Sequence, residues 1–258
     1  MTDYVVVCVA SLIASGLTFF SGFGLGTLLL PAFALFFPLP SAIAMTAVVH
    51  LLNNFFKLLL IGQHVDKDVV IRFGAPTVLT AFFGAMALVR LSDLEPLYTY
   101  QLAGSVRGVT PVGVVVAALM AVFAMMEVGP ASRKIRFDRK YLPLGGMLSG
   151  FFGGLSGHQG ALRSAFLIKC GLSKEAFIAS GVGIACIVDV VRVGVYGANY
   201  DLLSLGERIP LVVAAVVAAF AGAVIGRRLL TKVSLQVVQY VVAVMLLFIA
   251  AGIGAGLI

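Results

Sequence analysis

Four polar residues in one apolar stretch of the sequence carry the kinds of side chain that bind anions or move protons. His50, Asn53, Asn54 and Lys57 lie in the apolar run 41–62 at the spacing i, i+3, i+4, i+7. In an α-helix this spacing puts all four side chains on one face. If that helix spans a membrane, an ionisable side chain costs about 2.5–3.5 kcal/mol, which favours a function for it. The alternative is a hydrogen-bonded seam between helices, or for Lys57 a side chain that reaches the cytoplasmic membrane surface.

A second group of ionisable residues lies in the later part of the chain. Asp189 and Arg192 are three residues apart in the run 175–197, so they can pair on one helical face. Either the pair only balances its own charges, or Arg192 meets an anion while Asp189 carries a proton. His158 is a further candidate for carrying a proton, because histidine titrates near neutrality. We therefore assign proton or ion coupling to His158, Asp189 and Arg192. Arg163 is assigned to anion binding, with an interfacial position as the alternative.

Two long apolar stretches are interrupted by glycine-rich segments. The stretch 4–37 is broken by SGFGLG at 21–26, and the stretch 142–171 is broken by GGLSGHQG at 153–160. Each stretch is too long for one membrane span of about 20 residues and short for two. We therefore expect two pairs of half-helices joined by unwound backbone. A helix N-terminus exposes unpaired N–H groups and a partial positive charge, and glycine lets an anion approach them closely.

These breaks predict an anion site where two half-helix N-termini meet, near Gly26 and Gly160. Amide and hydroxyl side chains would add neutral hydrogen bonds, and lysine or arginine would add positive charge. The residues predicted to bind the substrate are Gly24, Gly26, Thr46, His50, Asn53, Asn54, Lys57, His158, Gln159, Gly160, Arg163 and Ser180. The sequence has no HExxH motif, no P-loop and no paired carboxylates, so we expect no enzyme, no cofactor and no metal site.

The composition places these residues in a membrane. Of the 258 residues 61% are hydrophobic and 11% are charged, and the mean hydropathy is +1.10. A soluble domain could not bury so much apolar surface, and intrinsic disorder requires the opposite composition. The net charge of +7 is typical of the basic cytoplasmic loops of membrane proteins, so we expect no nucleic-acid partner. The chain is therefore predicted to be an all-α polytopic membrane protein.

The spans and their direction follow from apolar length and from the positions of the basic residues. The linker 127–141 is basic and is expected in the cytoplasm, whereas the loops 91–97 and 198–207 are acidic and suit the outside. Arg107 falls near the outer end of the span 98–126. The six predicted spans are 41–62, 69–90, 98–126, 175–197, 209–230 and 234–256. Both termini then lie outside, provided that each broken stretch re-enters and returns to its own side.

The two halves of the sequence match sparsely at an offset of 134 residues. At this offset Ser15 falls on Ser149, and Gly26 falls on Gly160. Each half would hold a broken re-entrant helical hairpin and three transmembrane helices, and this odd number of crossings inverts the second half. The expected parts are a first membrane repeat (1–126), a basic cytoplasmic linker (127–141) and a second, inverted membrane repeat (142–258). Inverted repeats with broken helices are typical of secondary transporters.

One pattern occurs once in each half: a glycine-rich break, a short apolar segment, and a helix that starts with small residues and Thr or Ser. It reads SGFGLGTLLLPAFALFFPLPSAIAMTAVVHLLNN in the first half and SGFFGGLSGHQGALRSAFLIKCGLSKEAFIASGVG in the second. In these segments the chain resembles the TauE/SafE family of sulfite and organosulfonate exporters, and the resemblance covers nearly the whole chain. It implies an inner-membrane carrier for small sulfur-containing or carboxylate anions. The family commonly has a denser glycine run at each break, and Thr-Ser where this chain has Thr46-Ala47 and Ser180-Gly181.

Together these features predict a secondary transporter that moves sulfite, an organosulfonate or a small carboxylate across the inner membrane by alternating access. Its partners would be the small anion, the lipid bilayer and a proton or sodium ion as the coupling ion. The oligomeric state, including a homo-oligomer, stays open. Two alternatives stay open as well: a passive anion channel whose pore is lined by the breaks, and a membrane subunit that scaffolds other proteins without transporting anything.

Overall fold

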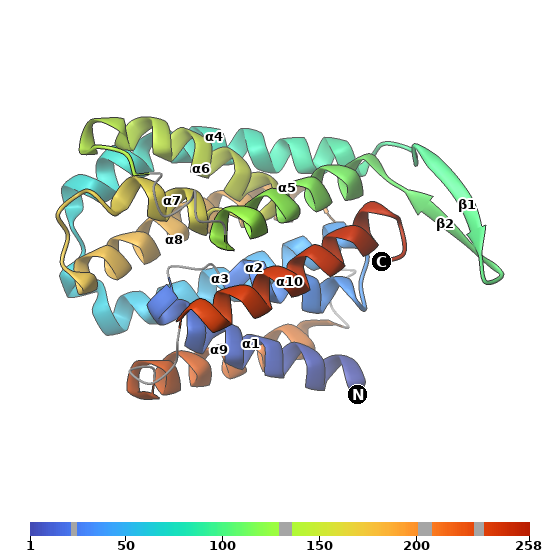
Figure 1. The fold of residues 1–258 in the computed structure, drawn as a ribbon, viewed down its shortest axis with the longest axis horizontal. Helices are drawn as coiled ribbons and strands as arrows, with labels where there is room; N and C mark the ends of the chain where they lie inside the picture. Colours follow the sequence, from blue (N-terminus) through green and yellow to red (C-terminus); the bar gives the residue numbers. More distant parts are fainter. Residues whose placement is uncertain (22–24, 129–135, 201–207, 230–234) are drawn as a thin grey trace.

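The computed structural model describes residues 1–21, 25–128, 136–200, 208–229 and 235–258, which form a bundle of helices with one β-hairpin (Figure 1). The helices are α1 (Thr2–Ser21), α2 (Leu25–Ala34), α3 (Leu39–Ile61), α4 (Lys67–Ser92), α5 (Pro111–Val128), α6 (Leu142–Ser156), α7 (Gly160–Leu167), α8 (Lys174–Asn199), α9 (Ile209–Leu229) and α10 (Leu235–Gly254). Local signals fix the starts of α4 and α8. The side chains of Asp66 and Ser173 each accept a hydrogen bond from the backbone N–H three residues later.

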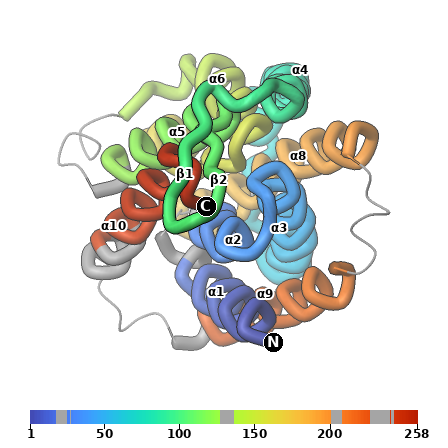
Figure 2. The backbone as a smooth tube through the Cα atoms, turned by 90° about the vertical axis from the view of Figure 1, so that its right-hand side faces the viewer, coloured from blue at the N-terminus to red at the C-terminus, as the bar shows by residue number. Residues whose placement is uncertain are grey.

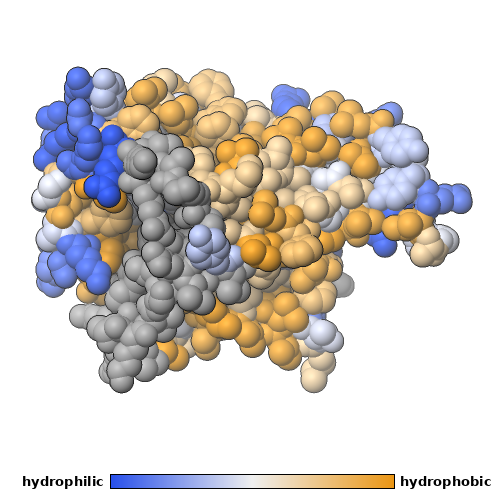
Figure 3. All heavy atoms as spheres, in the orientation of Figure 1, coloured by the Kyte–Doolittle hydropathy of each residue, from blue (hydrophilic) through white to orange (hydrophobic). Residues whose placement is uncertain are grey.

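The bundle has the surface of a membrane protein. Among the described residues, α3, α4, α8 and α9 are long and apolar enough to span a membrane. Large apolar side chains on these helices, such as Leu59, Phe83 and Val217, are exposed. Figure 3 shows hydrophilic residues gathered at the two ends of the molecule, with a mainly hydrophobic surface between them. A lipid bilayer requires such an apolar belt between polar ends, so the chain is a multi-pass membrane protein.

The helices of the two halves of the chain are packed against each other in pairs. α1 packs on α9, α4 on α6, α3 on α8, and α5 on α10, so each pair joins a helix of one half to a helix of the other. Figure 2 looks along the bundle and shows α2 and α3 between α4, α5 and α6 on one side and α1 and α9 on the other. Both termini lie at the same end of the bundle (Figure 1).

Glycines bring two of these pairs into backbone contact. A Cβ added to Gly84 of α4 would overlap the carbonyl oxygen of Phe151 on α6, and one added to Gly154 of α6 would overlap α4. A Cβ on Gly226 of α9 would lie 2.6 Å from the carbonyl oxygen of Gly16 on α1. Small residues allow membrane helices to approach this closely and to gain van der Waals contact. The α4–α6 and α1–α9 pairs are therefore tightly joined units.

Both interrupted stretches contain two helices in sequence. α1 has 20 residues and α2 has 10, while α6 has 15 and α7 has 8. α6 ends at Gly157, whose φ of 80° lies in the left-handed region that glycine favours. In Figure 1 the chain returns after each break toward the end of the bundle from which it came. The predicted interruption of 142–171 is present but shorter than the predicted 153–160, since only residues 157–159 lie between α6 and α7; residues 22–24 of the first break lie outside the described residues.

One predicted span is wrong in its first part. Residues 98–109 form a β-hairpin, with β1 (Tyr98–Leu102) paired antiparallel to β2 (Ser105–Val109). Alternating aromatic and β-branched residues favour strands, and the turn at Ala103 and Gly104 has positive φ at both positions, as tight hairpins require. Arg107 consequently lies on β2 and not in a span, and its Nη1 donates to the carbonyl oxygen of Leu257 at 3.0 Å. The helix itself begins only at Pro111.

Candidate functional site

Residues predicted on α3 and α8 meet around one buried carboxylate, that of Asp189. His50 Nδ1 lies 2.6 Å from Asp189 Oδ2, and Asn54 Nδ2 donates to the same oxygen at 3.1 Å. Arg192 Nε donates to the other oxygen, Oδ1, at 2.9 Å, and Arg192 Nη2 lies 2.9 Å from it. All four side chains are buried. One carboxylate therefore links a histidine of the first half of the chain to an arginine of the second half.

The charges buried in this part of the bundle do not balance. Lys57, Arg163 and Arg192 are 2%, 8% and 0% exposed, and Asp189 is the one carboxylate among the buried residues that the structure describes. Arg163 and Arg192 are two guanidinium groups against one described carboxylate, which leaves an excess of positive charge when the histidines are neutral. A buried charge without a counter-charge is costly, so this region suits an anion.

Several buried polar atoms around the second break have no hydrogen-bond partner among the described residues. These atoms are Gln159 Nε2 and Oε1, His158 Nε2, Arg163 Nη1, Arg192 Nη1 and Thr46 Oγ1. Buried polar groups in native proteins are rarely left unpaired. Most of these atoms are nitrogen donors or can become donors, so they could receive the oxygen atoms of a sulfonate, sulfite or carboxylate group.

The second break and the start of α2 lie close together through their glycines. A Cβ added to Gly26 would lie 3.5 Å from the carbonyl oxygen of Gly157 and 3.8 Å from Cγ2 of Thr46. A Cβ added to Gly157 would lie 2.6 Å from Arg192 Nη1, so this guanidinium rests against the backbone of the break. The structure thus brings Gly26, Thr46 and Arg192 to the second break. The buried residue Gly160 begins α7 directly after the break.

Two of the predicted residues have other surroundings. Asn53 is buried on α3, and its Oδ1 accepts a hydrogen bond from Ser15 Oγ of α1 at 3.0 Å. Ser180 Oγ accepts from the backbone N–H of Asp66 at 2.9 Å, which ties the start of α8 to the turn before α4. Ser180 therefore has a structural contact within the fold. Gly24 lies outside the described residues.

His158 and Lys57 are both enclosed by protein. His158 Nδ1 lies 3.2 Å from Ser156 Oγ, and its ring stacks on Phe123 of α5 with a centroid distance of 6.1 Å. No described carboxylate shares a hydrogen bond with His158, in contrast to His50. Lys57 is buried on α3, so its side chain does not extend to the aqueous surface of the molecule as the snorkelling alternative required.

Sequence reasoning missed several residues of this region. Ser15 bonds Asn53, and Ser149 Oγ donates to the carbonyl oxygen of Gln159 at 3.3 Å. These two serines are matched at the offset of 134 residues, and that match was the signal which could have found them. The hydroxyl of Tyr196 donates to the carbonyl oxygen of Gly154, and no pattern in the sequence predicts this contact.

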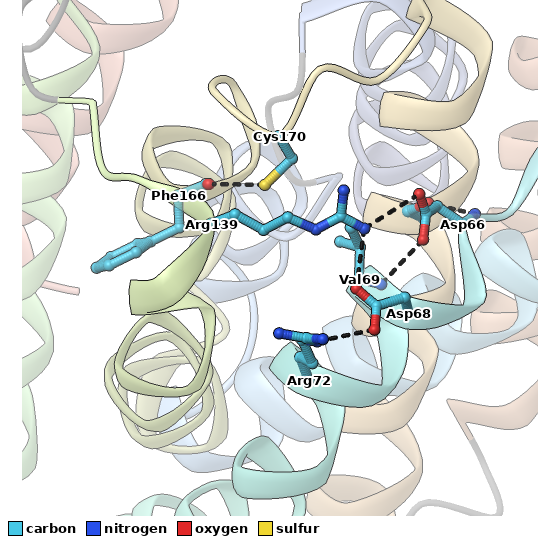
Figure 4. A network of polar contacts seen from close by, with 8 residues as sticks. Asp66, Asp68, Val69, Arg72, Arg139, Phe166 and Cys170 are labelled. Carbon is cyan, nitrogen blue, oxygen red and sulfur yellow. Dashed lines mark hydrogen bonds and ion pairs between the residues drawn. The ribbon is translucent and has the colours of Figure 1, made fainter.

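A separate polar cluster lies at the end of the bundle that holds the turn before α4 (Figure 4). Arg139 Nη2 lies 2.8 Å from Asp68 Oδ2 and 3.7 Å from Asp66 Oδ2, and Arg72 Nε donates to Asp68 Oδ1 at 2.7 Å. The hydrogen bond to Asp68 raises the pKa of the Arg139 guanidinium. Because these charges are partly or well exposed and balance one another, the cluster is a contact between the linker 127–141 and the start of α4 and not a binding site.

Two other features do not suit an anion or a metal. An apolar cavity of about 390 Å³ lies between α3, α8 and α9, and its lining includes no charged residue. Within the described ranges, no group of three or more His, Cys, Asp or Glu residues could hold a metal ion.

Comparison with known proteins gives one family. A family model described as "Sulfite exporter TauE/SafE" matches residues 7–253 of the chain. No curated protein matches the chain.

Proposed function

The chain belongs to the TauE/SafE family of sulfite exporters, and from this premise we propose that it is a secondary transporter of a small anion. The family is one of membrane transporters of sulfur anions and not of enzymes. The proposed substrate is sulfite, an organosulfonate or a small carboxylate, which crosses the inner membrane by alternating access. The proposal concerns the substrate class, the binding residues and the mechanism.

The observation that carries the proposal is the excess of buried positive charge. Arg163 and Arg192 are both buried, and each has a buried Nη1 atom without a hydrogen-bond partner among the described residues. A guanidinium group holds a sulfonate or carboxylate with two parallel hydrogen bonds, which a lone ammonium group cannot do. A bound anion would therefore balance the charge and satisfy these donors at the same time.

Neutral donors would complete the proposed site. Gln159 and Thr46 offer buried polar atoms, and the N-termini of α2 and α7, near Gly26 and Gly160, offer backbone N–H groups. The free energy needed to move the anion out of water is smaller when such groups replace its hydration shell. His158 lies at the same break and could donate a further hydrogen bond from Nε2.

We propose an inverted repeat as the basis of alternating access. In such a repeat, helices α1 to α5 would correspond in order to α6 to α10. The packed pair α1–α9 then corresponds to the packed pair α6–α4, and the pairs α3–α8 and α5–α10 each join two corresponding helices. The parts would be residues 1–126 and 142–258, joined by the cytoplasmic linker 127–141. Both termini would lie outside, in agreement with their shared end of the bundle in Figure 1. The burial of Asp189, Arg192 and Gln159 favours a carrier that is closed around its site over an open channel.

Anion flux into liposomes tests the proposed function. We would measure uptake of sulfite, methanesulfonate, sulfoacetate, acetate and sodium by wild type, by Arg163→Gln and by Arg72→Gln. Arg72 is the matched control, because it is an exposed arginine outside the site. We expect saturable uptake of at least one anion, lost in Arg163→Gln and kept in Arg72→Gln. Flux of sodium alone, no flux, or equal anion flux by all three proteins would contradict the proposal.

A further inference from the structure

We infer that His50, held by Asp189 and Asn54, binds the proton that is transported together with the anion. This inference rests on the proposed function, and it names the coupling ion and the residue that carries it. Sequence reasoning assigned coupling to His158, Asp189 and Arg192 and placed His50 only in the anion site. The geometry around Asp189 changes this assignment.

His50 and Arg192 share the same carboxylate. Asp189 accepts from His50 and Asn54 at Oδ2 and from Arg192 at Oδ1, and the contact between His50 Nδ1 and Asp189 Oδ2 is the shortest of these, at 2.6 Å. A carboxylate at this distance stabilises the imidazolium form of a histidine. It also holds the ring in one orientation. A change in the charge of His50 therefore changes how strongly Asp189 attracts Arg192, the arginine that we place in the anion site.

The charges that face His50 come from several elements. Asp189 of α8 attracts a proton to His50, whereas Arg192 of α8 and Arg163 of α7 oppose it. The other titratable groups packed around this region are Lys57 on α3, Cys186 and Tyr196 on α8, and His158 between α6 and α7. α2 has no charged residue. Burial of the ring also opposes its protonation, so the described charges that face His50 are one carboxylate in favour of a proton and two guanidinium groups against it.

An anion would change that balance. When a monoanion binds Arg163 and Arg192, it cancels positive charge that opposes the protonation of His50. The imidazole then takes up one proton from a hydronium ion of the solvent on the ring nitrogen that does not face Asp189, a water molecule is left behind, and the added charges of +1 and −1 cancel. Anion and proton therefore bind cooperatively, and the coupling must be equal in both directions. A carrier with this property moves the two together, and their gradients set the direction of net flux.

The other two histidines, His158 and His64, are not bonded to a described carboxylate that also binds an arginine of the anion site. His158 lies next to Ser156 Oγ and Phe123, and no described carboxylate is bonded to it. His64 is exposed in the turn before α4, where it contacts Gln63. Since the chain has three histidines, only His50 joins a carboxylate to the anion site.

Proton uptake on anion binding tests the inference. Methanesulfonate and sulfoacetate would be added to purified wild type in weak buffer between about pH 5.5 and about pH 8, where histidine titrates and a sulfonate stays ionised. Sulfite is unsuitable because it exchanges protons itself. Wild type should take up close to one proton per bound anion. Its anion affinity should fall by up to about tenfold per pH unit above the range in which His50 titrates.

His50→Asn is the decisive variant, because an asparagine amide can still donate to Asp189 from the position of Nδ1 but cannot titrate. It should bind the anion without proton uptake and with an affinity that changes less than about twofold with pH. His64→Asn is the matched control and should behave as wild type. If His50→Asn does not fold, NMR of the histidines in wild type and in His64→Asn identifies which ring becomes protonated when the anion binds.

The outcomes separate the inference from the proposed function. Anion binding without proton uptake by wild type, or uptake that persists in His50→Asn, overturns the inference and leaves the anion site standing. Protonation of His158 or His64 and not of His50 in the NMR experiment has the same meaning. If neither sulfonate binds to wild type, the inference fails together with a sulfonate site.

Discussion

Replacing Asp189 by asparagine removes the buried carboxylate that pairs with Arg192 and contacts His50. The amide has nearly the same shape, but Arg192 loses a charged partner at 2.9 Å and His50 loses one at 2.6 Å. Removing one partner of a buried ion pair costs roughly 3–5 kcal/mol, because the remaining charge stays buried without compensation. A domain of this size loses about 2–4 °C of melting temperature per kcal/mol. We therefore expect Asp189→Asn to unfold roughly 6–20 °C below wild type.

The double variant Asp189→Leu with Arg192→Met separates structure from mechanism. Replacing both partners of a buried pair by apolar residues of similar size is often neutral, within about 1–2 kcal/mol. The double variant should therefore be more stable than Asp189→Asn but inactive, because the anion has lost its guanidinium. Thermal unfolding in detergent and anion flux in liposomes measure the two effects. A single variant as stable as wild type would refute the reasoning about charge, and transport by the double variant would show that the pair is only structural.

Three further predictions concern glycine packing and surface charge. Gly84→Leu should prevent α4 from reaching α6 and abolish the folded protein in size-exclusion chromatography, whereas Gly194→Ala, with nothing within 4 Å, should leave it intact. Gly157→Ala combines a positive φ with a contact at 2.6 Å to Arg192, so anion uptake should be lost while the protein still folds. Arg139→Gln cuts exposed ion pairs and should lower the melting temperature only slightly, with the difference vanishing in high salt.

The sequence was sufficient to predict the long helices. Apolar runs of about 20 residues have few other structures available in a membrane, and α3, α4, α8 and α9 match the predicted spans within a few residues. The hairpin 98–109 was missed because its residues were joined to the strongly apolar run that follows them, although the segment itself contains Gln101 and Arg107. The polar residues of 98–109 and the Ala-Gly pair at its turn were the available signals for a hairpin outside the membrane.

The polar residues could be predicted one by one but their partners could not. His50, Asn54, Asp189 and Arg192 were found because polar side chains in apolar runs are costly. Spacing along a helix predicted the pair of Asp189 and Arg192, which are three residues apart. The contact of His50 with Asp189 joins residues 139 positions apart, and it depends on how α3 packs on α8. Periodicity within one helix carries no such information.

The contrast between the two kinds of helix contact indicates where the molecule can move. Backbones touch along α4–α6 and α1–α9, so sliding these pairs would drive carbonyl groups into neighbouring helices. At the α3–α8 contact the partners are side chains around Asp189, which can exchange one hydrogen bond for another. Both tight pairs contain one helix from each half of the chain, so a simple rocking of one half against the other would have to break them.

We therefore expect α4–α6 and α1–α9 to move as rigid units, with the conformational change concentrated at α3, α8 and the break at Gly157. Distances between spin labels on α4 and α6 should stay fixed when an anion binds, whereas those between α3 and α8 should change.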